Sequence, residues 1–323
     1  MAASKPPLLV VGGPTASGKT MLAVDIAAEL GGEIICADSM QVYRGMEIAT
    51  AAPTSEERRG IPHHLFGILE PEESFSVAQY IHLARAAIQE ITSRGALPIL
   101  CGGTGLYISC LIDGTQLAHT SGENSARRSQ LREMAAQKGP DHLWGMLNTV
   151  DPELAAGLHP NNLGRVIRAI EVYEQTGLPM SEWQRRSKLG ESPYNVCFLA
   201  LGYTDRQLLN DRIDRRVELM LEQGLLEEVK AMAARGGLGT ANQAIGHKEF
   251  ATYLKGEQTL AEATQLLKTR TRQYAKRQLT WLQRDKQIIW LAPDSFESYE
   301  QLLIEAIRLA RETLPLREGK HES

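Results

Sequence analysis

The fold of this chain is decided by the stretch Gly13-Pro14-Thr15-Ala16-Ser17-Gly18-Lys19-Thr20, which fits the pattern G-x-x-x-x-G-K-[ST]. The apolar run Leu8–Val11 comes directly before it, and Leu22, Ile26 and Leu30 follow at intervals of four residues. The run is typical of a buried strand, and the interval of four is typical of a helix. The sequence therefore predicts a strand, a glycine-rich loop and a helix in succession.

Each residue type in this loop has a chemical reason. The glycines let backbone N–H groups wrap around a phosphate, and the helix N-terminus adds partial positive charge. Lys19 can reach the next phosphate, and the hydroxyl of Thr20 can hold Mg²⁺. From average composition the pattern arises by chance in only ~1% of chains of this length. A di- or triphosphate ligand with Mg²⁺ is the strongest inference that the residues alone allow.

Further strands and helices alternate after the loop. Glu33–Ala37 predicts a second strand with Asp38 just beyond its end, Ser76–Arg94 predicts a helix, and Leu97–Cys101 predicts a third strand that runs into Gly102-Gly103. Alternation of this kind implies a parallel sheet, whose ligands gather at the carboxyl ends of the strands. Asp38 could hold Mg²⁺ there, or accept a proton from a nucleophile. The residues leave these two roles open, and a kinase, an NTPase or an enzyme with a diphosphate leaving group would all fit.

The strand pattern disappears in the middle of the chain. Residues 118–191 are rich in arginine and helix-like, and the strands resume only at Asn195–Leu201 and Gln287–Leu291. The remaining predicted helices are Ser125–Lys138, His142–Val150, Asn162–Gly177, Asp205–Gln223, Leu225–Arg235, Leu260–Arg284 and Phe296–Arg311. We predict an α/β fold with a P-loop NTPase-like parallel sheet core, residues 1–117 and 192–323, and a mostly helical insertion domain, residues 118–191.

Charge and composition limit the partners and the location. The net charge is −4, but residues 1–118 carry 7 basic and 12 acidic side chains, 119–290 carry 24 and 20, and 291–323 carry 4 and 7. A polyanionic partner is therefore permitted on the middle of the chain. Apolar runs are too short to cross a bilayer, and the first residues lack a secretory pattern, so we expect a cytoplasmic protein. The four cysteines form no CxxC pair and are expected to be reduced, mostly buried thiols.

Six stretches together resemble the tRNA dimethylallyltransferases, also called tRNA isopentenyltransferases. They are Gly13–Thr20 (GPTASGKT), Asp38–Ile48 (DSMQVYRGMEI), Pro62–Leu65 (PHHL), Gly102–Tyr107 (GGTGLY), Ile245–Glu249 (IGHKE) and Thr271–Leu282 (TRQYAKRQLTWL). The resemblance implies transfer of a dimethylallyl group from dimethylallyl diphosphate to N6 of the adenosine next to the anticodon (position 37) in tRNAs that read codons beginning with U, with release of diphosphate. The phosphate loop would then grip the prenyl donor, although the family is often described as nucleotide-binding or ATP-binding.

The resemblance also implies catalytic roles. Lys19, the loop amides and Mg²⁺ on Thr20 would neutralise the leaving diphosphate, and Asp38 would take the proton from N6. The family has a diphosphate-binding arginine near Asp205–Met220, for which we favour Arg216 over Arg212. The alternative is that these arginines form a solvated basic face paired with neighbouring aspartates.

The resemblance implies that the insertion domain, residues 118–191, binds tRNA, and individual tRNA contacts follow from family positions. The predicted residues are Asp38, Ser39, Met40, Gln41, Thr104, Arg165, Arg168, Ile245, Gly246, His247 and Lys248. The adenine must first be turned out of the anticodon loop. Residues 268–286 add seven basic side chains against Asp285, interleaved with Tyr274 and Trp281, a composition suited to RNA. We expect most of these basic residues to contact tRNA and Trp281 to be buried.

Three short stretches of the sequence need separate interpretation. His63-His64 could suggest a metal, but no carboxylate spacing supports one, and structural packing is favoured. The family usually reads GTAKP where this chain has Ala49-Thr50-Ala51-Ala52-Pro53, so a glycine and a lysine are both alanine. His247 stands where many relatives have tyrosine. The predicted activity is unaffected, because Lys19 and Asp38 are present.

Rival functions differ in the features that they explain. An adenylate isopentenyltransferase acting on free AMP, ADP or ATP would share the core but would not need the basic helical insertion. A P-loop small-molecule kinase does not explain the DSMQVY, GGTGLY or TRQYAKRQLTW stretches. A catalytically silent RNA-binding protein would have no need of the intact loop. No cysteine follows Trp290, so we expect a bacterial-type enzyme without a zinc-finger extension, and a monomer.

Overall fold

The computed structural model of this chain describes residues 5–115, 125–187, 191–236 and 240–315. The chain forms two compact units, one built from Met1–Ile112 with Pro193–Ser323 and the other from Asp113–Ser192. Each unit has its own hydrophobic core. The predicted insertion, residues 118–191, falls within the second unit, and its first residues, 118–124, lie outside the described ranges.

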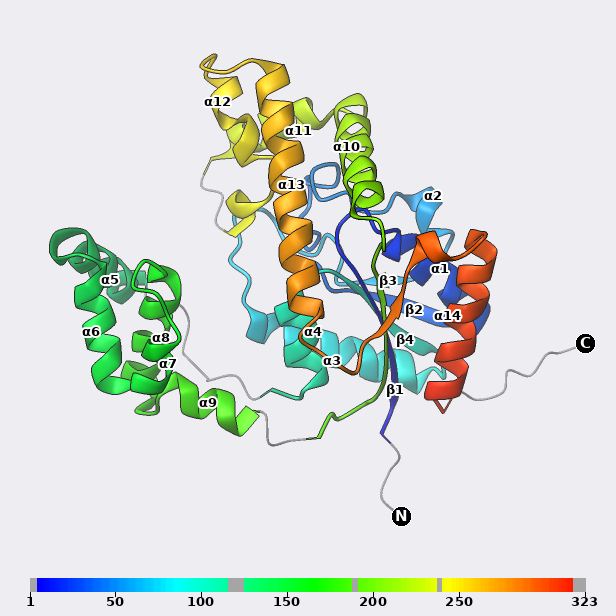
Figure 1. The fold of residues 1–323 in the computed structure, drawn as a ribbon, viewed down its shortest axis with the longest axis horizontal. Helices are drawn as coiled ribbons and strands as arrows, with labels where there is room; N and C mark the ends of the chain where they lie inside the picture. Colours follow the sequence, from blue (N-terminus) through cyan, green and yellow to red (C-terminus); the bar gives the residue numbers. More distant parts are fainter. Residues whose placement is uncertain (1–4, 116–124, 188–190, 237–239, 316–323) are drawn as a thin grey trace, which may run out of the picture. The chain divides into compact units, whose positions relative to one another are not determined.

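The first unit contains a six-stranded sheet in which every pairing is parallel (Figure 1). Its strands are β1 (Pro7–Gly12), β2 (Gly32–Cys36), β3 (His63–His64), β4 (Leu97–Gly102), β5 (Asn195–Leu201) and β6 (Ile289–Leu291). They lie in the order β3-β2-β4-β1-β5-β6, so β5, which follows the second unit in the sequence, pairs with β1 at the centre. The predicted α/β class with a parallel sheet is confirmed.

Helices cover the sheet, which explains the composition of β1. All of Leu8–Val11 is fully buried, and a strand covered on both faces reads as a continuous apolar run instead of an alternating one. The helices α1 (Lys19–Leu30) and α14 (Tyr299–Thr313) share one core cluster with β1, and α3 (Val77–Ser93) packs against β2 and β4. Among the described residues, no helix is both long and apolar enough to cross a membrane.

A second group of helices completes the first unit. It consists of α2 (Ser55–Arg58), α4 (Gly105–Ile112), α10 (Arg206–Glu222), α11 (Leu225–Arg235), α12 (Ala251–Leu254) and α13 (Leu260–Leu282), with the short 3₁₀ helices η1 (Thr240–Gln243), η2 (Lys248–Phe250) and η3 (Pro293–Ser295). Helices α10 and α13 pack side by side (Figure 1). Helix α13 begins at a capping box, because the hydroxyl of Thr259 accepts from the N–H of Glu262 while the Glu262 carboxylate accepts from the N–H of Thr259.

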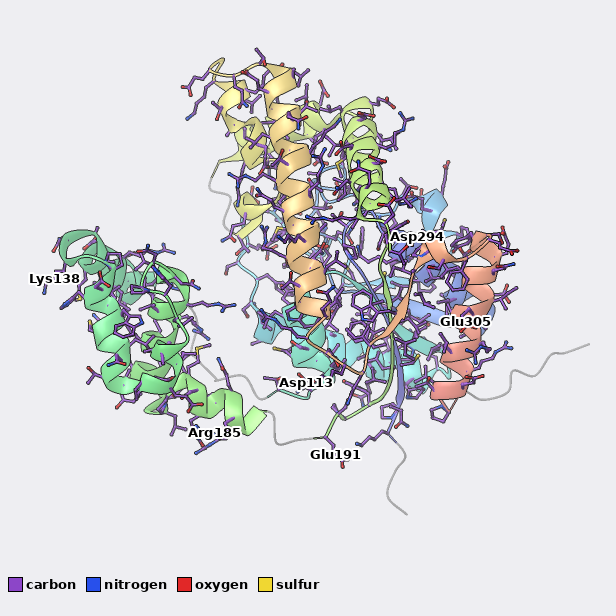
Figure 2. The ribbon with its side chains drawn as sticks, in the orientation of Figure 1. Asp113, Lys138, Arg185, Glu191, Asp294 and Glu305 are labelled. Carbon is purple, nitrogen blue, oxygen red and sulfur yellow. The ribbon has the colours of Figure 1, made fainter. Side chains whose placement is uncertain are left out.

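The start of α10 is fixed by a carboxylate from far along the chain. Asp294, labelled in Figure 2, accepts hydrogen bonds from the N–H of Thr204 at 3.1 Å and from the N–H of Asp205 at 2.9 Å. The hydroxyl of Thr204 also donates to Asp294 and, as the largest cause, holds the pKa of that carboxyl down at about 2. Because Asp205 caps α10, this contact sets where the arginines of that helix lie.

The described part of the second unit is helical. It contains α5 (Ser125–Lys138), α6 (Pro140–Val150), α7 (Pro152–Ala156), α8 (Leu163–Thr176) and α9 (Met180–Ser187), around a core that includes Leu143, Leu147 and Val166. Arg128 pairs with the buried Glu171, and Arg185, labelled in Figure 2, pairs with Glu153 and Glu182. The prediction of a helical insertion is confirmed for these residues.

Several predicted details need correction. The sequence did not predict α2, β3, α4, α7 or α9, and the last helix begins at Tyr299 with Ser298 as its cap, later than predicted. Trp281 was predicted to be buried and is only half-buried. Its ring lies against Gly105, where an added Cβ would come within 2.1 Å, so one part of the ring is covered and the rest remains accessible. The four cysteines are buried and free, as predicted.

Candidate active site

The phosphate loop between β1 and α1 has the conformation that its glycines allow. Gly18 caps α1 at φ 95°, and Gly13 has φ 149°, where an added Cβ would lie 3.1 Å from the carbonyl oxygen of Leu201. Ala16 also has a positive φ of 63°. The hydroxyl of Ser17 is buried and has no hydrogen-bond partner among the described residues. A buried hydroxyl without a partner, in a glycine-rich loop that leads into a helix N-terminus, fits an anion.

Lys19 is folded back on its own loop. Its Nζ donates to the carbonyl oxygen of Pro14 at 3.2 Å. Burial lowers the pKa of Lys19 below its usual value, Arg216 lowers it further, and the neighbouring Cys101 and Asp38 oppose the shift. A buried cation without a direct ion pair among the described residues is a strong attractor for an anionic ligand.

The predicted base lies where the ends of β2 and β4 meet. Asp38 Oδ1 accepts from the N–H of Met40 at 2.9 Å, which holds the carboxylate in place. The N–H of Ser39 donates to Thr104 Oγ1 at 2.9 Å, and the N–H of Thr104 donates to the carbonyl oxygen of Ala37 at 3.0 Å. The structure therefore brings together Asp38, Ser39 and Thr104, which the sequence separates by about 65 residues.

Arg216 reaches the same place from α10. Its side chain is half-buried, and its NH2 group lies 3.4 Å from the carbonyl oxygen of Thr50 and 3.5 Å from that of Ala51. Its Nε atom is shielded from solvent and has no hydrogen-bond partner among the described residues. Burial lowers the pKa of Arg216 to about 10, against the opposing effect of the Asp38 carboxylate. Arg216 therefore has donor capacity left for an anion next to Asp38.

Arg212 lies one turn before Arg216 and contacts the outside of the phosphate loop. Its Nε donates to the carbonyl oxygen of Ala16 at 2.9 Å, and its guanidinium lies over the ring of Tyr203. Asp214, a suggested partner of this helix face, pairs instead with Arg272. Arg216 does not belong to a solvated face, because it is half-buried beside Thr50 and Ala51, whereas Arg212 is exposed although its Nε contacts the phosphate loop.

These groups surround one recess. It is lined by Lys19, Thr20, Ile34, Cys36, Asp38, Gln41, Pro53, His63, Phe66, Cys101 and Gly102. Its lining includes an ammonium, a hydroxyl and a carboxylate, together with the amide of Gln41, the imidazole of His63 and apolar side chains. The recess can thus bind a phosphate group at one end, next to a carboxylate that is able to move a proton.

The oxygen donors of the recess fit Mg²⁺. Thr20 and Asp38 line the same recess, and hard oxygen ligands are what this ion prefers. Among the described residues, no group of three His, Cys, Asp or Glu side chains could hold a metal alone. Mg²⁺ commonly keeps several waters and is held by one or two protein oxygens together with substrate phosphates.

The sequence of the chain can be placed among known proteins. Residues 41–285 match the model of the family described as IPP transferase. The chain belongs to the IPP transferase family. It is 45% identical to a tRNA dimethylallyltransferase of Caldanaerobacter subterraneus subsp. tengcongensis over 298 residues, which are 91% of this chain and 94% of that protein.

Solved structures agree with this assignment. A full-length tRNA isopentenylpyrophosphate transferase from Bacillus halodurans is 42% identical, with a TM-score of 0.71 and coverage of 96% of this chain and 98% of that one. A eukaryotic dimethylallyltransferase acting on tRNA is 30% identical, with a TM-score of 0.81 and coverage of 98% of this chain and 81% of that one. The P-loop NTPase-like core expected from the resemblance is the fold of this IPP transferase.

Two further side chains of the IPP transferase site were not predicted. Gln278 is buried on α13, accepts from the N–H of Thr15 at 2.9 Å and donates to the carbonyl oxygen of Gly103 at 3.0 Å. Tyr274, one turn earlier, lies beside Thr104, and burial raises its pKa, with a further contribution from Asp38. A stripe at positions 274, 278 and 281 was the available signal, but Tyr274 was counted with the RNA-binding composition of the helix and Trp281 was expected to be buried.

The predicted tRNA-contacting side chains are unevenly exposed. In the segment 245–248, Lys248 is exposed while Gly246 and His247 are buried, so His247 does not lie on the surface as a tRNA contact requires. Its burial is explained by its position 3.5 Å from Glu228. In the second unit, Arg165 is exposed on α8 and Arg168 is half-buried. These positions leave the tRNA contacts of Lys248 and Arg165 as predictions.

Some basic residues of α13 form ion pairs within the protein, while others are exposed. Lys268 pairs with Glu218 at 2.8 Å, and Arg272 pairs with Asp214, so both have structural partners. Lys276 is exposed, and Arg277 is exposed with its guanidinium over the ring of Tyr274. Contact with RNA by most basic residues of the helix stays a prediction, and it is better supported for the residues near its end.

His63 and His64 form the edge strand β3 and have protein partners. His64 Nε2 lies 2.7 Å from Glu33 Oε2, and the same carboxylate pairs with Arg94. His63 Nδ1 lies 2.8 Å from the carbonyl oxygen of Ile61. These contacts agree with a packing role for the pair, and His63 also borders the recess.

Proposed function

We propose that this IPP transferase transfers a dimethylallyl group from dimethylallyl diphosphate to N6 of the adenosine next to the anticodon, position 37, in tRNA. The observation that supports it best is that Lys19 and Asp38 line a single recess beside a phosphate loop, and that a second cation, Arg216, lies close enough to interact electrostatically with both. The relatives named tRNA dimethylallyltransferase support the choice of acceptor.

The chemistry follows from what each group can do. N6 attacks the first allylic carbon, the bond from this carbon to the diphosphate oxygen breaks, and the diphosphate leaves with the electron pair. N–H groups of the phosphate loop that have no protein acceptor, together with Lys19 and Arg216, bind the charge that develops on the leaving group. Asp38 accepts the proton that N6 loses as the new bond forms. Mg²⁺ held by Thr20 would supply further positive charge to the diphosphate.

The basic side chains of the second unit favour tRNA over free adenine nucleotides as the acceptor. A free nucleotide requires only the recess, whereas the second unit adds exposed basic side chains such as Arg165 that a small acceptor has no use for. The preference for codons that begin with U, the cytoplasmic location and the monomeric state stay predictions from the sequence.

The test uses radiolabelled dimethylallyl diphosphate with Mg²⁺ and, in parallel, total tRNA and AMP. We expect label in tRNA, and a loss of at least roughly a hundredfold in Asp38→Ala, because a positioned base contributes on the order of 10²–10⁴ to such rates. Binding of tRNA to Asp38→Ala, measured by filter retention, should stay close to that of the unmodified protein.

A matched control is Glu222→Ala, which removes an exposed acid at the end of α10 and should leave transfer unchanged. Label in AMP with tRNA inert would contradict the proposed acceptor. Full transfer by Asp38→Ala would contradict the assignment of the base.

A further inference from the structure

A buried carboxylate outside the recess anchors one of its walls. Glu228, on α11, accepts from the N–H of Ile48 at 2.7 Å through Oε2 and from the N–H of Ala49 at 2.9 Å through Oε1. Its side chain is only 8% exposed. Hydrogen bonds from backbone amides to an ionised acceptor are short and strong, so this carboxylate fixes the backbone of residues 46–53.

The anchored segment presents two carbonyl groups to the site. Gln41 Nε2 donates to the carbonyl oxygen of Thr50 at 3.0 Å and to that of Ala51 at 3.3 Å. The NH2 group of Arg216 lies against the same two oxygens. The orientation of both side chains therefore depends on where the segment holds these carbonyl groups.

One residue of segment 46–53 has a strained backbone conformation. Ala51 has φ 45°, in the left-handed region that disfavours residues with a Cβ. Such a conformation persists only where the surroundings impose it. The paired hydrogen bonds to Glu228 come just before Ala51 and supply such a constraint.

Two residues that differ from the usual family pattern, Ala49 and His247, lie beside Glu228. Ala49, which stands where the family usually has glycine, donates to Glu228, and its Cβ lies 3.0 Å from where a Cβ on Gly246 would be. His247, which stands where many relatives have tyrosine, places Nε2 3.5 Å from Glu228 Oε1. That Nε2 is buried and has no hydrogen bond among the described residues. Ala49 and His247 thus both lie against the carboxylate of Glu228.

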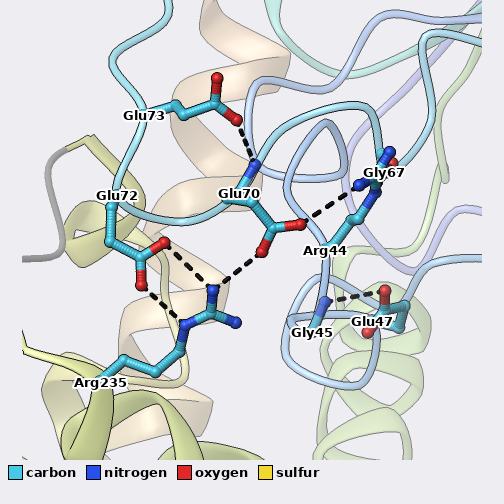
Figure 3. A network of polar contacts seen from close by, with 8 residues as sticks. All are labelled: Arg44, Gly45, Glu47, Gly67, Glu70, Glu72, Glu73 and Arg235. Atoms are coloured by element: carbon cyan, nitrogen blue, oxygen red, sulfur yellow. Dashed lines mark hydrogen bonds and ion pairs between the residues drawn. The ribbon is translucent and has the colours of Figure 1, made fainter.

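The other end of α11 also contacts this part of the chain, but at the surface. Arg235 pairs with Glu70 and Glu72, and Arg44 pairs with Glu70 (Figure 3). These side chains are between about a third and three fifths exposed, and exposed ion pairs are weak and screened by salt. Glu228 is therefore the stronger of the two attachments.

We propose that Glu228 is a positioning residue for the diphosphate site, acting through residues 46–53 on Arg216 and Gln41. The proposal rests on the proposed function, because it assigns to Arg216 the leaving diphosphate. Glu228 touches neither substrate. It holds the carbonyl groups that orient the guanidinium, and His247 closes the other side of its carboxylate.

The experiment measures the Kd of inorganic pyrophosphate by calorimetry, and the KM values of dimethylallyl diphosphate and tRNA by kinetics. Glu228→Ala should raise the first two by roughly tenfold, the effect of one strong hydrogen bond, and leave the KM for tRNA within about threefold. Glu228→Gln keeps one acceptor and should lie between. Glu227→Gln, at an exposed neighbouring acid, is the control and should match the unmodified protein.

A double-mutant cycle separates positioning from a general loss of stability. In an Arg216→Ala background, Glu228→Gln should have no further effect on pyrophosphate binding, since the group that it positions is gone. Unchanged pyrophosphate binding in Glu228→Ala, or equal losses with and without Arg216, would overturn the proposal. A failure of tRNA prenylation in the unmodified protein would contradict the proposed function. The pyrophosphate measurements would still test the role of Glu228, because pyrophosphate binding needs no turnover.

Discussion

Two backbone segments border the recess, and they hold their shapes in different ways. The phosphate loop, residues 13–20, is shaped mainly by glycines within it, with one distant hydrogen bond from the N–H of Thr15 to Gln278, and Gly18 caps the helix that follows directly. The segment 46–53 has no glycine, contains the left-handed Ala51, and is anchored by Glu228 about 180 residues along the chain. The first segment combines shape and chemistry in the same residues. In the second, a distant side chain provides the shape, so shape and chemistry can be altered separately.

This contrast predicts that the largest loss of activity follows from replacing a charged side chain of the phosphate loop. Lys19→Met should lower kcat/KM by about a thousandfold or more, because it removes a buried cation from the leaving diphosphate. The thermal unfolding midpoint should not fall, since a buried charge without a direct ion pair costs stability in the free protein. Steady-state kinetics with saturating tRNA, alongside thermal unfolding, measures both. A variant that unfolds early would show that Lys19 shapes the loop as well.

The lowered pKa of Lys19 predicts how pyrophosphate affinity changes with pH. Its folded pKa is lowered from 10.5, and the cation is the form that binds an anion. Pyrophosphate affinity should therefore be greatest below this lowered pKa and decrease as pH rises through it, before an ordinary lysine would titrate. Lys19→Arg should move the decrease to higher pH, because a guanidinium stays charged. Calorimetry across this range tests it, and a curve that is the same in both proteins would contradict the assignment to Lys19.

A smaller effect tests whether the phosphate loop really supports itself. Gln278→Met removes the partners of the Thr15 N–H and the Gly103 carbonyl, which should cost about 2 kcal/mol of unfolding free energy and raise the KM for dimethylallyl diphosphate. The control is Gln273→Met at an exposed position of the same helix. Urea unfolding and kinetics measure the two effects. A neutral Gln278→Met would show that the loop needs no distant anchor, and would sharpen the contrast between the two segments.

The same contrast explains what the sequence could predict. The phosphate loop, the strands Leu8–Val11 and Asn195–Leu201, and the position of Asp38 after a strand all follow from local patterns, and the structure has them there. Gln278 and Glu228 lie 263 and 180 residues from their partners. No local period or motif encodes such a contact, because it exists only once the sheet and the helices α11 and α13 are assembled.

Errors at the site have the same origin. His247 was predicted on the tRNA surface from its place in a motif, but its side chain turns to Glu228. Trp281 was predicted to be buried from its place on an apolar ridge, but it packs against Gly105 and stays half-buried. In both cases the residue type was read correctly, while the neighbour that decides its exposure comes from a distant part of the chain.

The smallest effect is expected at the outer attachment of α11. Arg235→Ala breaks the exposed ion pairs with Glu70 and Glu72, so the unfolding midpoint should fall only slightly, and the difference should vanish at high salt, where such pairs are screened. Pyrophosphate affinity should not change, because Glu228 still holds the segment that orients Arg216. Thermal unfolding at low and high salt, with calorimetry on the same samples, measures this. If Arg235→Ala weakened pyrophosphate binding as much as Glu228→Ala, the segment would be held by the whole helix, and the distinction between a buried anchor and a surface one would be lost.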